Sequence, residues 1–262
     1  MLKIIWKYRA QFRVHRETIK LAERLLGKEL MTWNDGDLFS ILCICIMAMT
    51  AHKMQSMRLL CRNGLAKDAV VLLRVLFEDI VNFNYMDNDK KRIRDFMDYD
   101  TWERLKISKW APKKTLEDSV KFAARVSELE QMWNKVKHKY TYTTGKRKGE
   151  VFDKWSGKNL WEMVKEVKGE ELYKYLYKYL SSFVHFNSTT FNEYVLGAKK
   201  DHIIVEIGLS DQFIPEVLVS SSALVLESLI RVINMCYKLR LDKEIEDLSR
   251  KVLGLKGSSR LA

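Results

Sequence analysis

The chain has 262 residues, of which 47% are hydrophobic and only two are proline, and it carries a formal net charge of +12. This composition allows a sizeable core, argues against disorder, and offers too few turn residues for an all-β fold. The excess of lysine and arginine favours a polyanionic partner, either nucleic acid or an anionic membrane surface, or else a basic surface with no specific partner.

Apolar periodicity predicts a series of helices in the first half of the chain, and glycine, asparagine and proline mark their ends. These helices are expected at about 3–27, 37–63, 66–86, from the acidic turn at 87–89 to about 110, and at about 115–140. The most apolar run, Leu38–Thr50, is about 13 residues long, shorter than the roughly 20 that span a bilayer, so we expect no transmembrane segment. The basic start of the chain has no signal-peptide pattern, and a membrane-surface helix is the alternative there.

The second half begins with an irregular segment at 141–157, which is expected to divide two subregions. Helices follow at about 158–167 and 170–186, and alternating apolar residues then predict one β-hairpin near residues 193–208. Pro215 suits the first turn of a long helix to about 239, which a short charged helix and a frayed tail at 254–262 follow.

These elements predict an all-α fold, a multi-helix bundle of about eight or nine helices with the one small β-hairpin. Because no Pro/Gly/Ser-rich linker interrupts the chain, we expect a single domain over residues 1–262. Its core is expected at about 40–190, with the hairpin and the long helix at 193–253.

The four cysteines lack the spacing of a zinc site, so they are interpreted as free thiols in a reducing, cytoplasmic compartment. Cys43 and Cys45 stand two apart in one predicted helix and should point to different sides.

Arg74 and Glu78 stand four residues apart in an almost wholly apolar helix, so their side chains share one face. This helix is expected to be central and buried, where a charge must be paired or must line a cavity. Two interpretations stay open. The pair either fixes helix packing, or Arg74 presents its guanidinium to an anion while Glu78 orients it.

A second candidate set closes a Tyr-rich helical pattern at His185. On a helix, three residues before it lie on or near its face: Lys178, Ser181 and Ser182. A histidine can move a proton near neutral pH, and a lysine can stabilise phosphate charge. Such chemistry needs no metal when an RNA 2′-hydroxyl attacks. The alternative is a helix-terminal histidine bonded to a backbone carbonyl.

Two further sets rest on less. A divalent metal would need four residues to come together, Glu78, Asp87, Asp89 and His185, and no metal-binding spacing supports this, so we expect no metal and no cofactor. Nucleic-acid phosphates could be contacted by four basic residues of the irregular segment: Lys146, Arg147, Lys148 and Lys154. A solvated loop is the alternative.

Met57–Asp89 resembles the signature of the DUF5677 family of uncharacterised prokaryotic proteins, an aliphatic helix containing Arg-x-x-x-Glu followed by an aromatic residue and an acidic turn. Asp153–Gly157 and Tyr177–Asn187 are similar to its second block, so the resemblance covers about residues 40–190. It implies a helical fold and no settled activity.

Lys178 and His185 enclose six residues, a spacing similar to that of HEPN-type ribonucleases, which are helical, usually dimeric, and use an arginine followed by a histidine. Lys178 stands where that motif has arginine, and Arg74 is expected to supply the guanidinium instead. This resemblance implies a metal-independent ribonuclease of a toxin or phage-defence system, a homodimer with an antitoxin or defence partner, and RNA rather than DNA as substrate. The alternatives are a non-catalytic basic module that binds nucleic acid or an acidic protein, and a metal-dependent enzyme.

Overall fold

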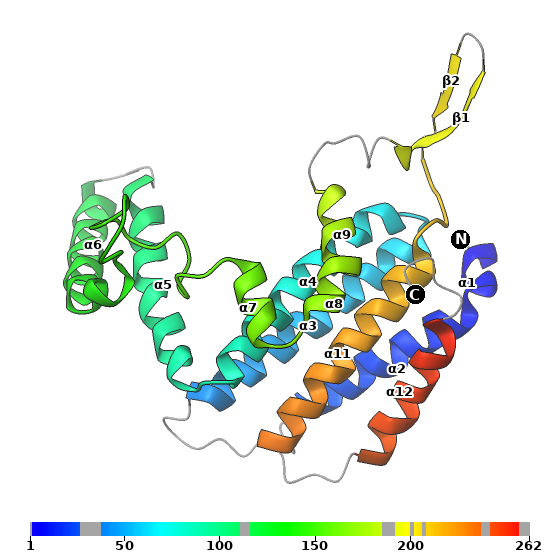
Figure 1. Cartoon of the computed structure of the whole chain (residues 1–262), viewed down its shortest axis with the longest axis horizontal. Helices are drawn as coiled ribbons and strands as arrows, with labels where there is room; N and C mark the ends of the chain where they lie inside the picture. Colours follow the sequence, from blue (N-terminus) through cyan, green and yellow to red (C-terminus); the bar gives the residue numbers. More distant parts are fainter. Residues whose placement is uncertain are drawn as a thin grey trace. The chain divides into compact units, whose positions relative to one another are not determined.

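The structure is a computed structural model that describes residues 2–26, 38–110, 116–184, 192–199, 202–205, 208–236 and 242–256 (Figure 1). The described residues are mostly helical. They form two compact units: Met1–Asn84 with Val167–Ala262, and Tyr85–Glu166. We call these the first and the second unit and describe each by itself.

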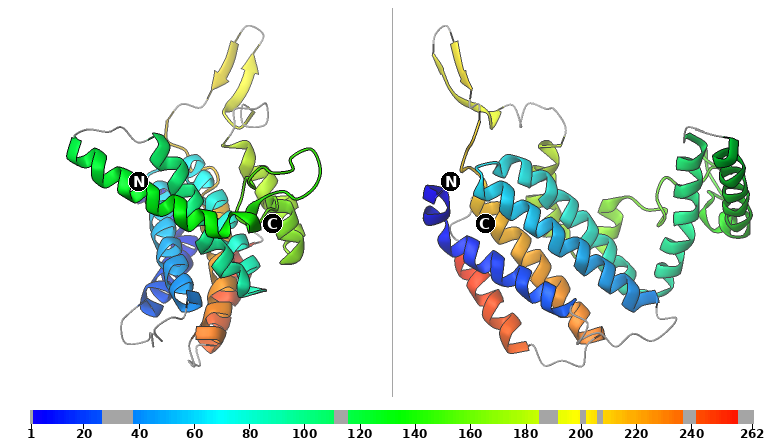
Figure 2. Two further views of the ribbon diagram at one scale, coloured as in Figure 1. Left: turned by 90° about the vertical axis from the view of Figure 1, so that its left-hand side faces the viewer. Right: turned by 180° about the vertical axis from the view of Figure 1, so that it is seen from behind.

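The first unit is a bundle of long helices with short segments attached to it. Its N-terminal helices are α1 (Leu2–Lys7), α2 (Arg9–Leu25), α3 (Leu38–Arg62) and most of α4 (Ala66–Asp87). Its later elements are α8 (Glu170–Leu172), η2 (Tyr173–Tyr177), α9 (Lys178–Ser182), α11 (Ile214–Cys236) and α12 (Asp242–Lys256). Helix α11 packs against α2, α3 and α12, and α2 also packs against α3 and α12 (Figure 2).

Helix α11 carries buried serines whose hydroxyl groups form hydrogen bonds within the helix. Pro215 stands in its first turn, as predicted, where the missing N–H leaves no hydrogen bond unmade. Ser221 and Ser222 are fully buried, and their hydroxyls donate to the backbone carbonyls of Val217 and Leu218 in the preceding turn. Because the hydroxyls are satisfied within the helix, the face that carries them can pack against its neighbours.

The N-terminal helix predicted over 3–27 is in fact two helices, α1 and α2, separated at Tyr8. The backbone of Tyr8 leaves the helical region, with φ −111° and ψ 29°. Asp211 accepts hydrogen bonds from the Tyr8 hydroxyl, at 3.1 Å, and from the Lys7 ammonium. This contact spans more than 200 residues of sequence, which explains why the local pattern gives no sign of the break.

Helix α3 is longer than its apolar start. Among the described helices it alone is long and apolar enough to cross a membrane, with a mean hydropathy of 1.4 over its most apolar 18 residues. The core helix of a soluble protein has the same length and hydropathy, so this finding is weak evidence for a membrane-spanning segment. In the second half of α3, Arg58 donates to the Phe12 carbonyl and Gln55 to Glu23, both on α2.

Helix α4 is largely buried, and one stripe of it faces outward. Leu73, Leu76 and Phe77 are at most 2% exposed, but Val75 is 38% exposed. Arg74 lies beside it on the half-buried side of the helix. The helix is therefore buried over most of its length, as expected, and the packing leaves one stripe of it facing outward.

The segment predicted as one helix over 170–186 consists of α8, η2 and α9. In η2 the backbone is π-helical, and the Lys178 N–H donates to the Tyr173 carbonyl five residues earlier. Helix α9 ends at Ser182, and residues 185–191 lie outside the described part of the chain. Helix α12 continues to Lys256, through the first residues of the predicted tail.

Two short strands, β1 (Val195–Lys199) and β2 (His202–Val205), pair antiparallel in the first unit, with an irregular register between Val195 and Gly197. They form the two-stranded sheet of the described residues. The fold class is thus helical, with these strands as a minor element.

The second unit contains α5 (Lys91–Trp110), α6 (Leu116–Val136), the 3₁₀ turn η1 (Lys137–Tyr140) and α7 (Leu160–Glu166). Aromatic residues dominate its core, in which Trp133 packs between Tyr99, Trp102 and Tyr140. The Tyr99 hydroxyl donates to the Phe152 carbonyl at 2.6 Å, which fixes the irregular segment 141–157 against this core. That segment lies inside the second unit, not between the two units.

Candidate functional site

A polar group on the surface of α4 joins Arg74, Glu78 and Tyr177. Arg74 Nη2 lies 3.1 Å from Glu78 Oε1, as the four-residue spacing predicts. Tyr177, which comes from η2, accepts a hydrogen bond from Arg74 Nη2 at 3.1 Å and donates one to Glu78 Oε1 at 2.7 Å. The three side chains close a ring of contacts that fixes η2 on α4.

The electrostatics of this group follow from partial burial and from the three partners. Burial disfavours the charged form of Arg74, but its contacts with Tyr177 and Glu78 outweigh this and raise the pKa of Arg74. Burial, together with the acceptor Glu78, raises the pKa of Tyr177 against the opposing effect of Arg74. Arg74 therefore stays a cation and Tyr177 a neutral phenol that can donate.

Arg74 is not sealed in the core. Its side chain is 18% exposed and that of Glu78 is 36% exposed. The Nε atom of Arg74, in contrast, is buried and has no hydrogen-bond partner. Since a guanidinium presents five N–H donors, the group retains donors for an anion that reaches this surface.

Aromatic packing aligns Tyr177 with Arg74. The Tyr177 ring lies 5.4 Å from the Phe77 ring and stacks on Tyr173 at 5.0 Å, with 20° between the planes. The Arg74 guanidinium lies 5.3 Å from the centre of the Tyr177 ring. The π-helical turn spans both stacked tyrosines, and such turns are frequent at functional sites.

A second polar contact fixes the same segment two residues further along, at Tyr179. The Tyr179 hydroxyl donates to Glu193 Oε1 at 2.7 Å, and Gln212 Nε2 donates to Glu193 Oε2 at 2.8 Å. The almost buried Lys67 ammonium, on α4, donates to the Glu193 carbonyl at 2.8 Å and lies 4.1 Å from the Tyr194 ring. Tyr177 and Tyr179 are thus both held by carboxylates, on either side of Lys178.

The remaining candidates near the end of this segment are placed only in part. Lys178 is exposed, which leaves its ammonium in solvent. The Ser182 hydroxyl donates to the Tyr179 carbonyl at 2.7 Å, whereas Ser181 is half-buried. His185 lies outside the described residues, so the structure does not test its distance from Lys178 or Arg74.

Tyr177 was not among the site residues predicted from the sequence. The tyrosines at 173, 175, 177 and 179 belong to the Tyr-rich pattern before His185, and alternate residues of a helix cannot all face one way. They do diverge, since Tyr175 is 72% exposed while Tyr177 contacts α4 and Tyr179 contacts Glu193. The sequence shows no sign of which tyrosine meets Arg74.

The basic loop of the second unit is partly neutralised by its own carboxylates. Arg147 forms a bidentate pair with Asp153, at 2.6 and 2.9 Å, and a further contact with Glu150 at 2.7 Å. These hydrogen bonds raise the pKa of Arg147, and the Asp153 pKa is lowered in turn. Three lysines of the predicted phosphate-binding set remain exposed: Lys146, Lys148 and Lys154.

No group of three or more His, Cys, Asp and Glu residues that could hold a metal ion occurs among the described residues. Two of the proposed ligands, Asp87 and Asp89, lie at the end of α4 and in the turn after it. Asp89 there accepts a hydrogen bond from the Lys91 N–H, consistent with a helix-start role.

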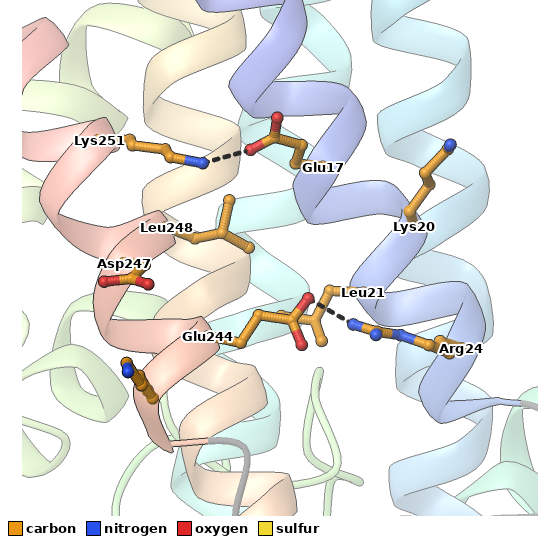
Figure 3. Close-up of a pocket in the computed structure, with 9 residues that line it drawn as sticks. Glu17, Lys20, Leu21, Arg24, Glu244, Asp247, Leu248 and Lys251 are labelled. Carbon is orange, nitrogen blue, oxygen red and sulfur yellow. Dashed lines mark hydrogen bonds and ion pairs between the residues drawn. The ribbon is translucent and has the colours of Figure 1, made fainter.

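A charged groove lies between α2 and α12 in the first unit (Figure 3). Lys251 pairs with Glu17 at 2.8 Å and Arg24 with Glu244 at 2.5 Å, so the ion pairs cross from one helix to the other. Lys20 points away from α12 (Figure 3). Because the facing charges pair with each other, we interpret this groove as a seam between two helices.

These observations define a mostly helical protein with a tyrosine-capped Arg–Glu pair on one of its long helices. Residues 40–203 match DUF5677, a family of unknown function. The chain belongs to this family, and the match includes Arg74, Glu78 and Tyr177. No curated protein and no solved structure matches the chain significantly. The resemblance to HEPN-type ribonucleases stays a prediction.

Proposed function

We propose that the protein is a metal-independent, HEPN-like ribonuclease. His185 is the general acid and base, Lys178 stabilises the charge of the phosphorane, and Arg74, oriented by Glu78 and Tyr177, binds phosphate. One observation supports this most. Tyr177, which bonds to both Arg74 and Glu78, is the residue immediately before Lys178. A guanidinium and an ammonium are thereby carried on two helical segments fixed to each other.

The proposed reaction is attack of an RNA 2′-hydroxyl on the adjacent phosphorus. His185 takes the proton of the 2′-hydroxyl, the bond from the 2′-oxygen to phosphorus forms, and the bond from phosphorus to the 5′-oxygen breaks. The leaving 5′-oxygen takes up a proton, so the products are a 2′,3′-cyclic phosphate and a 5′-hydroxyl. DNA lacks the attacking group, which is why RNA is the proposed substrate.

The two serines would differ in this mechanism. Ser182 already donates its hydroxyl proton to the Tyr179 carbonyl, which favours a structural role in ending α9. Ser181 is therefore the better candidate for orienting His185. The toxin or phage-defence setting, the homodimer, the antitoxin or defence partner and the cytoplasmic location belong to this proposal through the HEPN resemblance alone.

The test is cleavage of a mixed RNA pool in excess EDTA by the parent protein, by His185→Ala and by His138→Ala. His138 is exposed in the second unit and serves as the matched control. Cleavage that resists EDTA and is lost only in His185→Ala supports the proposal. Equal cleavage by the parent and His185→Ala refutes it, and cleavage that EDTA abolishes indicates a metal-dependent enzyme.

A second candidate function is a non-catalytic module that binds nucleic acid or an acidic protein. It is favoured by the ring of contacts itself, because Glu78 and Tyr177 both contact Arg74 Nη2, as partners in a structural pair would. This alternative predicts salt-dependent binding without turnover. Binding that does not change between low and moderate salt would exclude its electrostatic form.

A further inference from the structure

Five arginines of the first unit form what we call the arginine surface: Arg9, Arg13 and Arg16 on α2, and Arg58 and Arg62 on α3. The α2 arginines follow at intervals of four and three residues, and the α3 arginines at an interval of four, so each set lies on one face of its helix. Helices α2 and α3 pack against each other, with the start of α2 beside the end of α3 (Figure 2).

No carboxylate pairs with any of these five guanidinium groups within the described part of the chain. Three exposed arginines on other helices do have carboxylate partners. Arg104 pairs with Asp100, Arg125 with Glu128, and Arg250 with Asp247. The positive charge of the arginine surface is therefore not compensated by the carboxylates of the described residues.

Arg58 joins the two helices of this surface. Its Nη1 donates to the Phe12 carbonyl at 2.5 Å, and its guanidinium lies 5.4 Å from the centre of the Phe12 ring. Burial lowers the pKa of Arg58, and the charges of Arg16 and Arg62 lower it further. These three arginines are thus close enough to repel one another, a cost that a bound anion would remove.

The chemistry of the surface fits a chain of phosphates. Guanidinium groups bind phosphate oxygens through paired N–H donors, and the surface offers arginine and not lysine at all five positions. Trp6 stands just before it on α1, is 74% exposed, and carries the Arg9 guanidinium 5.4 Å from its ring centre. An exposed indole beside cations is suited to stacking on an unpaired base.

We propose that the arginine surface binds the phosphate backbone of single-stranded RNA. This inference rests on the proposed function for the choice of RNA, and it adds a docking site on α2 and α3 made of residues other than those proposed for catalysis. The surface holds the strand by charge and stacking, while the chemistry takes place elsewhere on the chain.

The test compares two triple variants of the full chain in binding a fluorescently labelled single-stranded RNA, by anisotropy over a range of salt concentrations. The first replaces the exposed members Arg13, Arg16 and Arg62 with glutamine and leaves Arg58 in place. The control replaces three ion-paired arginines of other helices, Arg104, Arg125 and Arg250, with glutamine. Both remove the same charge, and circular dichroism verifies that both are folded.

The surface variant is expected to bind at least about tenfold more weakly at low salt, with the slope of log affinity against log salt reduced by roughly 2 for three lost phosphate contacts. The control variant is expected to keep most of the affinity and the slope. Equal losses in both variants, or no loss in either, would overturn the proposal. So would binding by the parent to phosphatidylserine vesicles but not to RNA.

This binding assay fails independently of the cleavage assay. If the surface is right and the ribonuclease proposal wrong, the surface variant loses affinity while neither it nor the parent cleaves RNA. If both are right, His185→Ala binds RNA as the parent does and the surface variant cleaves with a raised KM.

Discussion

His15 gives the sharpest test of the packing of the first unit. It lies on α2, is 0% exposed, and neither ring nitrogen has a hydrogen-bond partner. Burial, and then the nearby charge of Arg58, lower the pKa of His15 from 6.5 to about 3. The imidazole is therefore neutral in the folded protein, whereas it can take up a proton in the unfolded chain.

The direction of the pH dependence follows from these two protonation states. Between about pH 6.5 and pH 3 the unfolded chain binds a proton at His15 that the folded protein does not, so stability rises with pH in this window. Acidification below the unfolded value thus destabilises the fold. When the pH falls from about 8 to about 5, only the last 1.5 units lie below the unfolded pKa of 6.5. Over these 1.5 units the free energy of unfolding falls by roughly 2 kcal/mol.

The perturbation is His15→Leu, which fills the space with an apolar side chain of similar size. We expect the parent to lose roughly 2 kcal/mol more than this variant between about pH 8 and pH 5, and the variant to be more stable at the higher pH by about 1 kcal/mol. Urea unfolding at each pH measures both, with His138→Gln as the exposed control. Carboxylates contribute equally to all three proteins, so parallel curves for parent and His15→Leu would refute the reasoning.

Three further predictions concern single contacts. Tyr177→Phe is expected to lower the free energy of unfolding by about 1 kcal/mol in urea, since a hydroxyl that bonds to two charged groups is lost, while Tyr175→Phe, at an exposed position, leaves it unchanged. Gly64→Ala is expected to cost about 1–3 kcal/mol in thermal unfolding, because φ is +76° and a Cβ would lie 3.0 Å from the Leu209 Cβ, whereas Gly254→Ala within α12 costs nothing. Maleimide labelling of the native protein, mapped by mass spectrometry, should modify Cys45 before the buried thiols of the same helix.

The positions of the long helices could be predicted because their signals are local. Apolar periodicity and terminal glycine or proline placed α4 at 66–86, against an observed Ala66–Asp87, and Pro215 in the first turn of α11. The break at Tyr8 could not be found this way, because the apolar pattern continues through it and the residue that holds it, Asp211, belongs to another part of the sequence. The π-helical turn at Tyr173–Tyr177 could not be predicted either, since its sequence is that of an ordinary helix.

In the candidate site, too, the contact between sequence neighbours could be predicted and the long-range contact could not. The Arg74–Glu78 pair follows from a spacing of four on one helix, which sequence supplies directly. Tyr177 stands 103 residues away from Arg74, and its contact depends on how η2 packs on α4. Partial exposure of Arg74 could not be predicted, because apolar residues surround it on all sides of the helix and give no sign of which side its neighbours leave uncovered.

The net charge of +12 is unevenly distributed, because some cations have carboxylate partners and others do not. Arg147 forms ion pairs with Asp153 and Glu150, and Arg74 forms one with Glu78, so neither contributes a free positive charge at long range. The arginine surface on α2 and α3 has no such partners among the described residues and sets the local field there. Attraction of a polyanion and orientation of a single phosphate are different tasks, because the first needs uncompensated charge and the second a guanidinium held in one geometry. Under the proposed function these two tasks fall to different helices, and substitutions at Arg13 and at Arg74 are then expected to separate affinity from turnover.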